Sequence, residues 1–150
     1  MILQPWQLRP REEAHSFNPA FCGSLSYEFV KSYTKAKGTS VDFPLTFCAL
    51  ALGLYPEARE RMPATTRTGL YSWIERTPEA LVGYSHRARM LVPYVKEAIT
   101  YATLRDAIVF TEKGQLSIGE KIASITNASL DRATSDLRDT VKAMRMIGKW

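Results

Sequence analysis

The chain has 150 residues, of which 45% are hydrophobic and 23% charged, and its formal net charge is +5. This length and composition are typical of one soluble globular domain with its own core, so residues 1–150 are treated as a single domain. No apolar run approaches the roughly 18–20 residues that a membrane span needs. The N-terminus lacks the basic and apolar regions of a secretory signal. We therefore expect a cytoplasmic protein without membrane contact.

The two cysteines and the excess positive charge indicate no particular site. Cys22 and Cys48 lie among apolar residues and lack the spacing of a disulfide framework or a zinc motif. We expect both to be small core residues in a reducing compartment. The basic residues are spread along the chain, which permits an acidic partner such as nucleic acid but more often reflects only a solvated surface.

The first strong helix signal is the stretch SFNPAFCGSLSYEFVKSY. Asn18 suits a helix N-cap, Pro19 suits the first helical position, and Gly38 suits the C-terminal end. An N-terminal helix is therefore predicted at about 18–36. Its apolar face repeats every four residues and consists of Phe21, Leu25, Phe29 and Tyr33.

The next two predicted helices differ in polarity. Between Pro44 and Pro56 almost every residue is apolar, so this helix should be buried on all sides at the centre of the core. The stretch ATTRTGLYSWIERTP then places Leu70, Trp73 and Ile74 on one face of a helix that ends before a proline.

A longer helix, or two helices that meet at Pro93, is predicted from SHRARMLVPYVKEAITYATLRD. Its buried stripe should consist of Leu91, Val95, Ala98, Ile99 and Ala102. The following stretch, IVFTEKGQLSIG, predicts a β-hairpin in which Gly114 takes the positive φ of the turn. A helix followed by a small hairpin is the way a winged-helix domain ends. The pattern leaves open whether this hairpin touches nucleic acid, touches a protein, or only closes the core.

A last amphipathic helix is predicted at about 128–147. Its apolar face consists of Leu130, Ala133, Leu137, Val141, Met144 and Ile147. This face packs either on its own domain or on a partner. The polar face mixes arginine and lysine with aspartate, so it does not form a phosphate-binding stripe.

The element order predicts a mainly α fold with a winged-helix-like core at about 44–120, one small β-hairpin, and extra N- and C-terminal helices. The residues expected in the buried core are Phe21, Leu25, Phe47, Leu50, Leu54, Leu70, Trp73, Val95 and Ile99.

No motif for catalysis or cofactor binding is found. The sequence contains neither a G-x-x-x-x-G-K-[ST] phosphate loop nor a G-x-S-x-G nucleophile motif. His15 and His86 lack neighbouring partners for a catalytic or metal site. We therefore expect no cofactor, no bound metal and no enzyme activity, and a small enzyme with an unrecognised site is the least favoured alternative.

Several short motifs occur together over roughly residues 6 to 120. They are Glu13-Ala14 ahead of Asn18-Pro19-Ala20-Phe21, then Pro44-Leu45, then Trp73 followed by Pro78, then Arg87-Ala88 leading to Val92-Pro93. In this order and spacing they resemble the middle component of three-component ABC-ATPase (ABC-3C) systems. These are bacterial conflict systems, of which Lamassu-type phage defence is one kind.

The resemblance implies a non-catalytic adaptor subunit. Such a subunit would sit between an SMC-like ABC ATPase, which engages DNA, and an effector such as a nuclease. It would hold the two in register, and its own contact with DNA would be weak or indirect. The lack of nucleotide-binding and catalytic motifs agrees with this role.

A winged-helix DNA-binding regulator is the alternative, and the helix before the hairpin separates the two hypotheses. A recognition helix needs basic or amide side chains opposite its buried stripe, whereas Glu97 and Leu104 lie there beside Lys96. Tyrosine, leucine and arginine together suit a protein interface better. The candidate interface residues are Tyr94, Tyr101, Leu104 and Arg105, of which the tyrosines and the arginine should form one continuous ridge. The candidate weak DNA contacts are Arg87, Arg89, Lys96 and Lys113.

Overall fold

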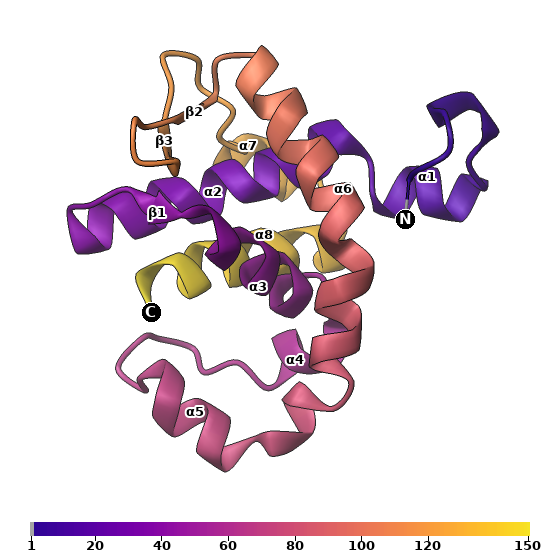
Figure 1. Ribbon diagram of the computed structural model, residues 1–150. Coiled ribbons are helices and arrows are strands. Elements are labelled where there is room, and N and C mark those ends of the chain that lie inside the picture. The colour runs from indigo at the N-terminus through magenta and orange to yellow at the C-terminus, as the bar shows by residue number, and fades with distance from the viewer. Residues whose placement is uncertain (1) are drawn as a thin grey trace.

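The computed structural model describes residues 2–150 as a mainly helical fold with a small antiparallel sheet (Figure 1). The four long helices are α2 (Pro19–Lys37), α3 (Phe43–Gly53), α6 (Tyr84–Leu104) and α8 (Ser135–Lys149). The shorter elements are η1 (Trp6–Leu8), α1 (Arg11–Ser16), α4 (Pro56–Glu60), α5 (Leu70–Arg76), η2 (Pro78–Leu81) and α7 (Asn127–Asp131). The strands are β1 (Val41–Asp42), β2 (Ile108–Phe110) and β3 (Gln115–Ile118). The predicted mainly α fold is confirmed.

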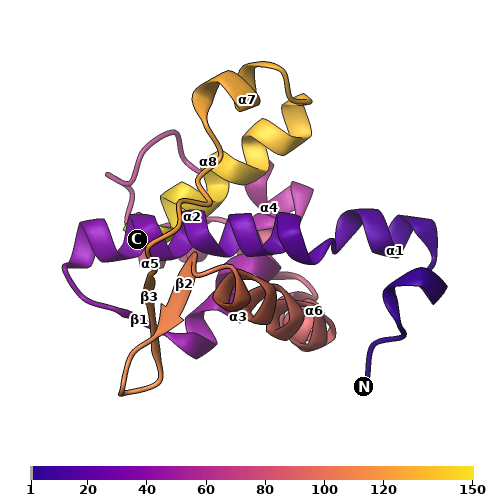
Figure 2. The same ribbon diagram turned by 90° about the horizontal axis from the view of Figure 1, so that it is seen from above.

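Helix α2 is the central element and follows the predicted start and end signals. The Asn18 side chain accepts hydrogen bonds from the amides of Ala20 and Phe21 at 2.8 and 3.3 Å, and Gly38 ends the helix with a φ of 71°. Figure 2 shows α8 on one side of α2, with α3 and α6 on the other. Because it is covered on both sides, α2 carries much of the buried core.

Helices α2 and α8 come into backbone contact near Gly148. A Cβ atom at this position would lie 2.6 Å from the carbonyl oxygen of Phe29. Glycine is therefore needed where the helices cross, because any larger residue would push α8 away from α2.

The predicted hairpin is confirmed as β2 and β3, and Gly114 has a φ of 73° in its turn. The sheet has a third strand, β1, that was not predicted, and the strand order is β1-β3-β2. With only two residues, β1 is too short to show an alternating pattern. The succession α2, β1, α3, α6, β2 and β3 is compatible with a winged-helix core. The predicted boundary at residue 44 stays a prediction, although the sheet already starts at Val41.

The prediction that α3 is buried on all sides is wrong. Pro44, Leu45 and Cys48 are exposed on its outer face, whereas Ala49 and Leu50 are buried. Neighbouring helices cover only one side of α3, so its uniform apolarity did not reveal which face points inward. Consequently Cys48 is not a core residue.

Cys22 is buried, as predicted, and its burial raises the pKa of the thiol to about 12. A thiol with this pKa stays protonated at neutral pH and is a poor nucleophile.

A second, smaller core holds residues 56–83, hereafter the outer lobe, against α8. Its buried members are Leu52, Ala58, Trp73 and Ala80. The Trp73 ring stacks on Trp150 at a centroid distance of 5.3 Å, and its Nε1 donates to the carbonyl of Arg61 at 2.7 Å. Burial of Trp73 is therefore confirmed. Leu70 is 37% exposed, so its predicted place in the core is wrong. It is the first residue of α5, and both of its chain neighbours, Gly69 and Tyr71, are exposed as well.

Of the other expected core residues, Leu25, Leu50, Val95 and Ile99 are buried in the main core. Phe21, Phe47 and Leu54 pack against it but stay partly exposed.

Helix α6 runs without interruption through Pro93, and its buried residues are the five of the predicted stripe. The C-terminal segment is instead split into α7 and α8, because Thr134 caps a new helix by accepting a hydrogen bond from the Leu137 amide at 3.3 Å. The apolar face of α8 packs on α2 and α3 of its own domain.

Replacing Trp73 with alanine should lower the free energy of unfolding by about 3–5 kcal/mol, the range for deleting a large buried aromatic side chain. Urea denaturation measures this loss. Trp6→Ala is the control, because Trp6 is partly exposed and lies outside both cores, and it should cost less than about 1 kcal/mol. An unchanged midpoint for Trp73→Ala would contradict the assignment of the outer-lobe core.

Candidate protein-interaction surfaces

Three of the four candidate interface residues lie together at the C-terminal end of α6. Leu104, the last residue of the helix, is 81% exposed. The guanidinium of Arg105 lies over the Tyr101 ring, 5.0 Å from its centre, in a cation–π contact. Tyr101, Leu104 and Arg105 are hereafter the α6 C-terminal surface. Its role in binding a partner stays a prediction.

Tyr94, the fourth candidate, lies two turns earlier on α6, and its place in one continuous ridge with Tyr101 and Arg105 stays a prediction. Its ring contacts Phe17 at a centroid distance of 4.5 Å, and its burial raises the pKa of the phenol to about 12. Phe17 immediately follows α1, a helix that the sequence analysis did not predict. Tyr94 therefore helps to pack the N-terminal segment onto α6.

The N-terminal segment is also fixed to α6 by an ion pair. Arg9 donates two hydrogen bonds of 2.7 Å each to the carboxylate of Glu97, and the Arg9 side chain is only 4% exposed. Sequence analysis noticed Glu97 as unfavourable for DNA but missed its partner, which is far away in the chain. The ion pair with Arg9 explains why a glutamate, Glu97, lies on the outer face of α6.

The four candidate DNA contacts have different environments. Arg89, Lys96 and Lys113 are exposed. Arg87 is half-buried, its guanidinium lies 3.5 Å from the centre of the Tyr55 ring, and it donates to the carbonyls of Val82 and Ala80. The Arg87 guanidinium is therefore held in one position by contacts within the domain, whereas the other three side chains extend into solvent, where they could meet phosphates.

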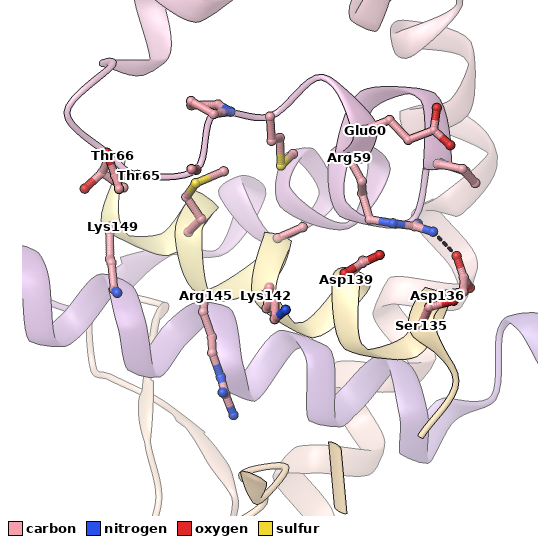
Figure 3. A pocket seen from close by; sticks show the side chains of 16 residues that line it. Arg59, Glu60, Thr65, Thr66, Ser135, Asp136, Asp139, Lys142, Arg145 and Lys149 are labelled. Atoms are coloured by element: carbon pink, nitrogen blue, oxygen red, sulfur yellow. Dashed lines mark hydrogen bonds and ion pairs between the residues drawn. The ribbon is translucent and has the colours of Figure 1, made fainter. Parts of the chain in front are cut away.

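A groove of about 790 Å³ lies between α8 and the segment formed by α4 and residues 62–66 (Figure 3). Its charged lining residues are Arg59, Glu60, Asp136, Asp139, Lys142, Arg145 and Lys149. Arg59 forms an ion pair with Asp136 across the groove. Because both signs of charge line it, the groove favours neither an anionic nor a cationic ligand.

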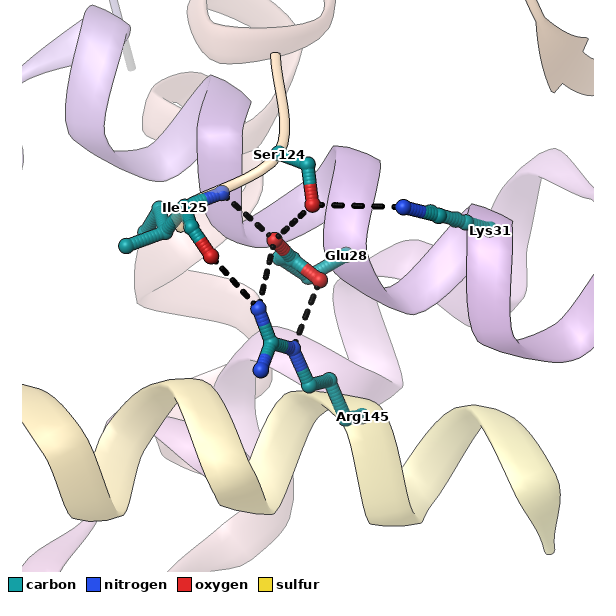
Figure 4. Close-up of polar contacts among 5 residues, drawn as sticks. All are labelled: Glu28, Lys31, Ser124, Ile125 and Arg145. Atoms are coloured by element: carbon teal, nitrogen blue, oxygen red, sulfur yellow. Dashed lines mark hydrogen bonds and ion pairs between the residues drawn. The ribbon is translucent and has the colours of Figure 1, made fainter. Parts of the chain in front are cut away.

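Behind this groove, Glu28 ties three segments together (Figure 4). Its carboxylate is 2% exposed and accepts hydrogen bonds from Arg145 Nε at 2.8 Å, from Ser124 Oγ at 2.8 Å and from the Ile125 amide at 2.7 Å. Arg145 also donates to the Ile125 carbonyl at 2.7 Å. Helix α8 and residues 124–125 are therefore joined to α2 through one charge.

Burial alone would raise the pKa of Glu28, but the hydrogen bonds from Arg145, Ser124 and Ile125 outweigh it and hold the pKa below its ordinary value. The sequence offered one signal for this cluster. Glu28 lies three residues after Leu25 and beside Phe29, so it falls on the apolar face of α2.

Residues 2–150 hold no group of three or more histidine, cysteine, aspartate or glutamate side chains placed to bind a metal ion. Within the same residues, no helix has the combined length and apolarity that a bilayer crossing requires. His15 and His86 are both exposed.

Residues 6–150 match the family model described as ABC-three component (ABC-3C) system Middle Component 3. The chain belongs to this family. No curated protein and no solved structure was found to match it. As a Middle Component 3 protein it is one part of a multi-component system, so it works with protein partners. The resemblance inferred from its motifs is confirmed at this level.

Glu28→Gln in this Middle Component 3 chain should lower the free energy of unfolding at pH 7 by about 1.5–3 kcal/mol. This is the range for hydrogen bonds to charged groups. It applies because the Arg145 side chain is partly exposed, so solvent can hydrate its charge when the carboxylate is gone. Chemical denaturation measures the loss, and the exposed carboxylate of Glu120 provides the control Glu120→Gln, which should be near neutral.

The same pair should make stability depend on pH. Because the folded pKa of Glu28 is lower than the unfolded value of about 4.3, its stabilisation is complete above that value and is lost as pH falls through the folded pKa. The wild type should lose more stability than Glu28→Gln between about pH 5 and about pH 3. Parallel pH profiles would show that Glu28 has no such effect.

Proposed function

We propose that this protein is a non-catalytic adaptor that holds an SMC-like ABC ATPase and a nuclease effector in one cytoplasmic, Lamassu-type defence complex. Its membership of the Middle Component 3 family supports a subunit that acts through partners. The observation that carries the proposal is Leu104, a large apolar side chain left 81% exposed at the end of a long helix.

The α6 C-terminal surface has the composition of an interface anchor. Tyrosine and arginine are enriched at the residues that contribute most to binding, and Tyr101 and Arg105 are already stacked before a partner arrives. A side chain that is held in place loses less entropy on binding. Ala107 and Ile108, which follow it closely in the chain, are buried, so the surface is attached directly to the core.

This surface therefore suits one partner of the complex, which would cover Leu104. Burial of a leucine side chain contributes about 1.5–3 kcal/mol, and the stacked pair would add polar contacts around it. The sequence analysis named the same three residues, together with Tyr94, as candidate interface residues.

The test is co-expression with the two other components of the system. Leu104→Ser, and separately Tyr101→Ala with Arg105→Ala, should weaken retention of one partner by at least about tenfold, as expected for anchor residues. The melting temperature should change by less than about 2 °C, because these side chains are not core. Circular dichroism melting and affinity co-purification measure the two effects.

Leu8→Ser is the matched control, because Leu8 is also an exposed leucine but lies in the N-terminal segment. It should leave the complex intact. Loss of the fold together with the complex would show that the α6 C-terminal surface is part of the core. A complete complex with both variants would place the interface elsewhere.

A DNA-binding regulator is the second candidate, favoured by the exposed Arg89 and Lys96 on α6 and Lys113 in the hairpin turn. These three side chains can neutralise only a few phosphates, so DNA binding by the isolated chain should be weak and without sequence preference. The slope of log K against log salt should be no steeper than about −3.

Filter binding between about 50 and 200 mM salt measures this slope, and Lys96→Glu with Lys113→Glu should flatten it. Nanomolar, sequence-specific binding at physiological salt would instead favour the regulator over the adaptor.

A further inference from the structure

A small apolar pocket of about 240 Å³ opens where the N-terminal segment, the end of α3 and the first half of α6 meet. Phe17 and Tyr94, whose rings are in contact, line one part of it, and Leu54 and Tyr55 line another. Met90, which is 47% exposed, brings the pocket to the surface. The volume is below the roughly 300–1,000 Å³ of small-molecule sites, so it suits a single side chain.

The one charged group in the lining is Arg87, and it is incompletely satisfied. Its two terminal nitrogens donate to the carbonyls of Val82 and Ala80, and its guanidinium stacks on Tyr55. Its Nε is buried and has no hydrogen-bond partner. No carboxylate of residues 2–150 forms an ion pair with it.

An unpaired buried donor is uncommon in folded proteins and calls for an explanation. Arg87 combines two such features, an unused N–H group and an uncompensated positive charge beside an apolar pocket. A carboxylate would compensate the charge, since arginine pairs with carboxylates through charge-assisted hydrogen bonds. Each terminal nitrogen donates one bond to a backbone carbonyl and keeps a second N–H group for such a pair. The intramolecular contacts fix the guanidinium beforehand, so the site is ready to receive one.

We propose that this pocket docks a segment of a partner protein that presents a leucine, methionine or phenylalanine side chain with an aspartate or glutamate within one helical turn. The apolar side chain fills the pocket, and the carboxylate pairs with Arg87. This inference rests on the adaptor function, because the partner is a second component of the same complex.

The pocket is separate from the α6 C-terminal surface. Met90 and Leu104 are fourteen residues apart on one continuous helix, which corresponds to about 21 Å along the axis. One helix therefore offers two docking sites at a fixed spacing, which is what an adaptor for two partners requires.

The first test uses the complete system, co-expressed and purified through this chain. Met90→Glu places a negative charge at the mouth of the pocket, where the partner's carboxylate binds, and should reduce retention of one partner at least tenfold. The partner held at the α6 C-terminal surface should be retained. His86→Glu is the matched control, since His86 is exposed one turn earlier on α6 and does not line the pocket. It should leave both partners bound.

The second test maps what covers the pocket. A photo-crosslinking phenylalanine analogue at position 90 should join this chain to a partner peptide that contains an apolar residue close to an aspartate or glutamate. Arg87→Lys, which keeps the charge but removes the planar guanidinium, should weaken the same complex about tenfold.

The outcomes separate the two proposals. If the wild-type chain co-purifies with neither component, the adaptor function is wrong and the docking pocket with it. If the wild-type complex forms and also survives Met90→Glu, only the pocket proposal is overturned. The pocket proposal is also overturned if the crosslinks from position 90 are confined to residues 2–9 of the same chain. A small carboxylate that stays with the purified protein in native mass spectrometry and is lost in Arg87→Lys would replace it with a small-molecule site.

Discussion

The ion pair between Glu28 and Arg145 is the interaction on which the arrangement of this domain depends. Apolar contacts between α2 and α8 are non-directional and tolerate sliding and rotation. A carboxylate that is buried and accepts hydrogen bonds from Arg145, Ser124 and Ile125 has one favourable geometry. Since an unpaired charge in the core would be strongly unfavourable, α8 and the chain before it can occupy only one position on α2.

The position of α8 in turn decides where the outer lobe lies. Trp150 follows α8, stacks on Trp73 and donates from its Nε1 to the carbonyl of Thr68 at 2.9 Å. The lobe then supplies the carbonyls of Ala80 and Val82 that hold the guanidinium of Arg87. A continuous series of contacts therefore leads from the buried charge on α2, through α8 and two aromatic rings, to the side chain at the proposed docking pocket.

The sequence predicted the elements whose signals are local. Asn18, Pro19 and Gly38 bound α2 correctly, Gly114 marked the hairpin turn, and the spacing of apolar residues gave the buried stripe of α6. What failed depended on distant partners. Which face of α3 is covered is decided by packing, so Cys48 was misplaced.

The same dependence on distant partners explains which candidate surface residues the sequence revealed and which it did not. Leu104 was found because exposure opposite a buried stripe follows from helix geometry alone. The contact of Tyr94 with Phe17 was not foreseen and Arg9 was overlooked, because the N-terminal segment that packs on α6 comes from the other half of the chain.

Trp73 and Trp150 are two of only three tryptophans, and both lie at the joint between the outer lobe and α8. Stacked indoles couple electronically, so the native protein carries its own spectroscopic reporter: any separation of lobe and core, including one caused by a partner, would change its ultraviolet emission and circular dichroism without an added label.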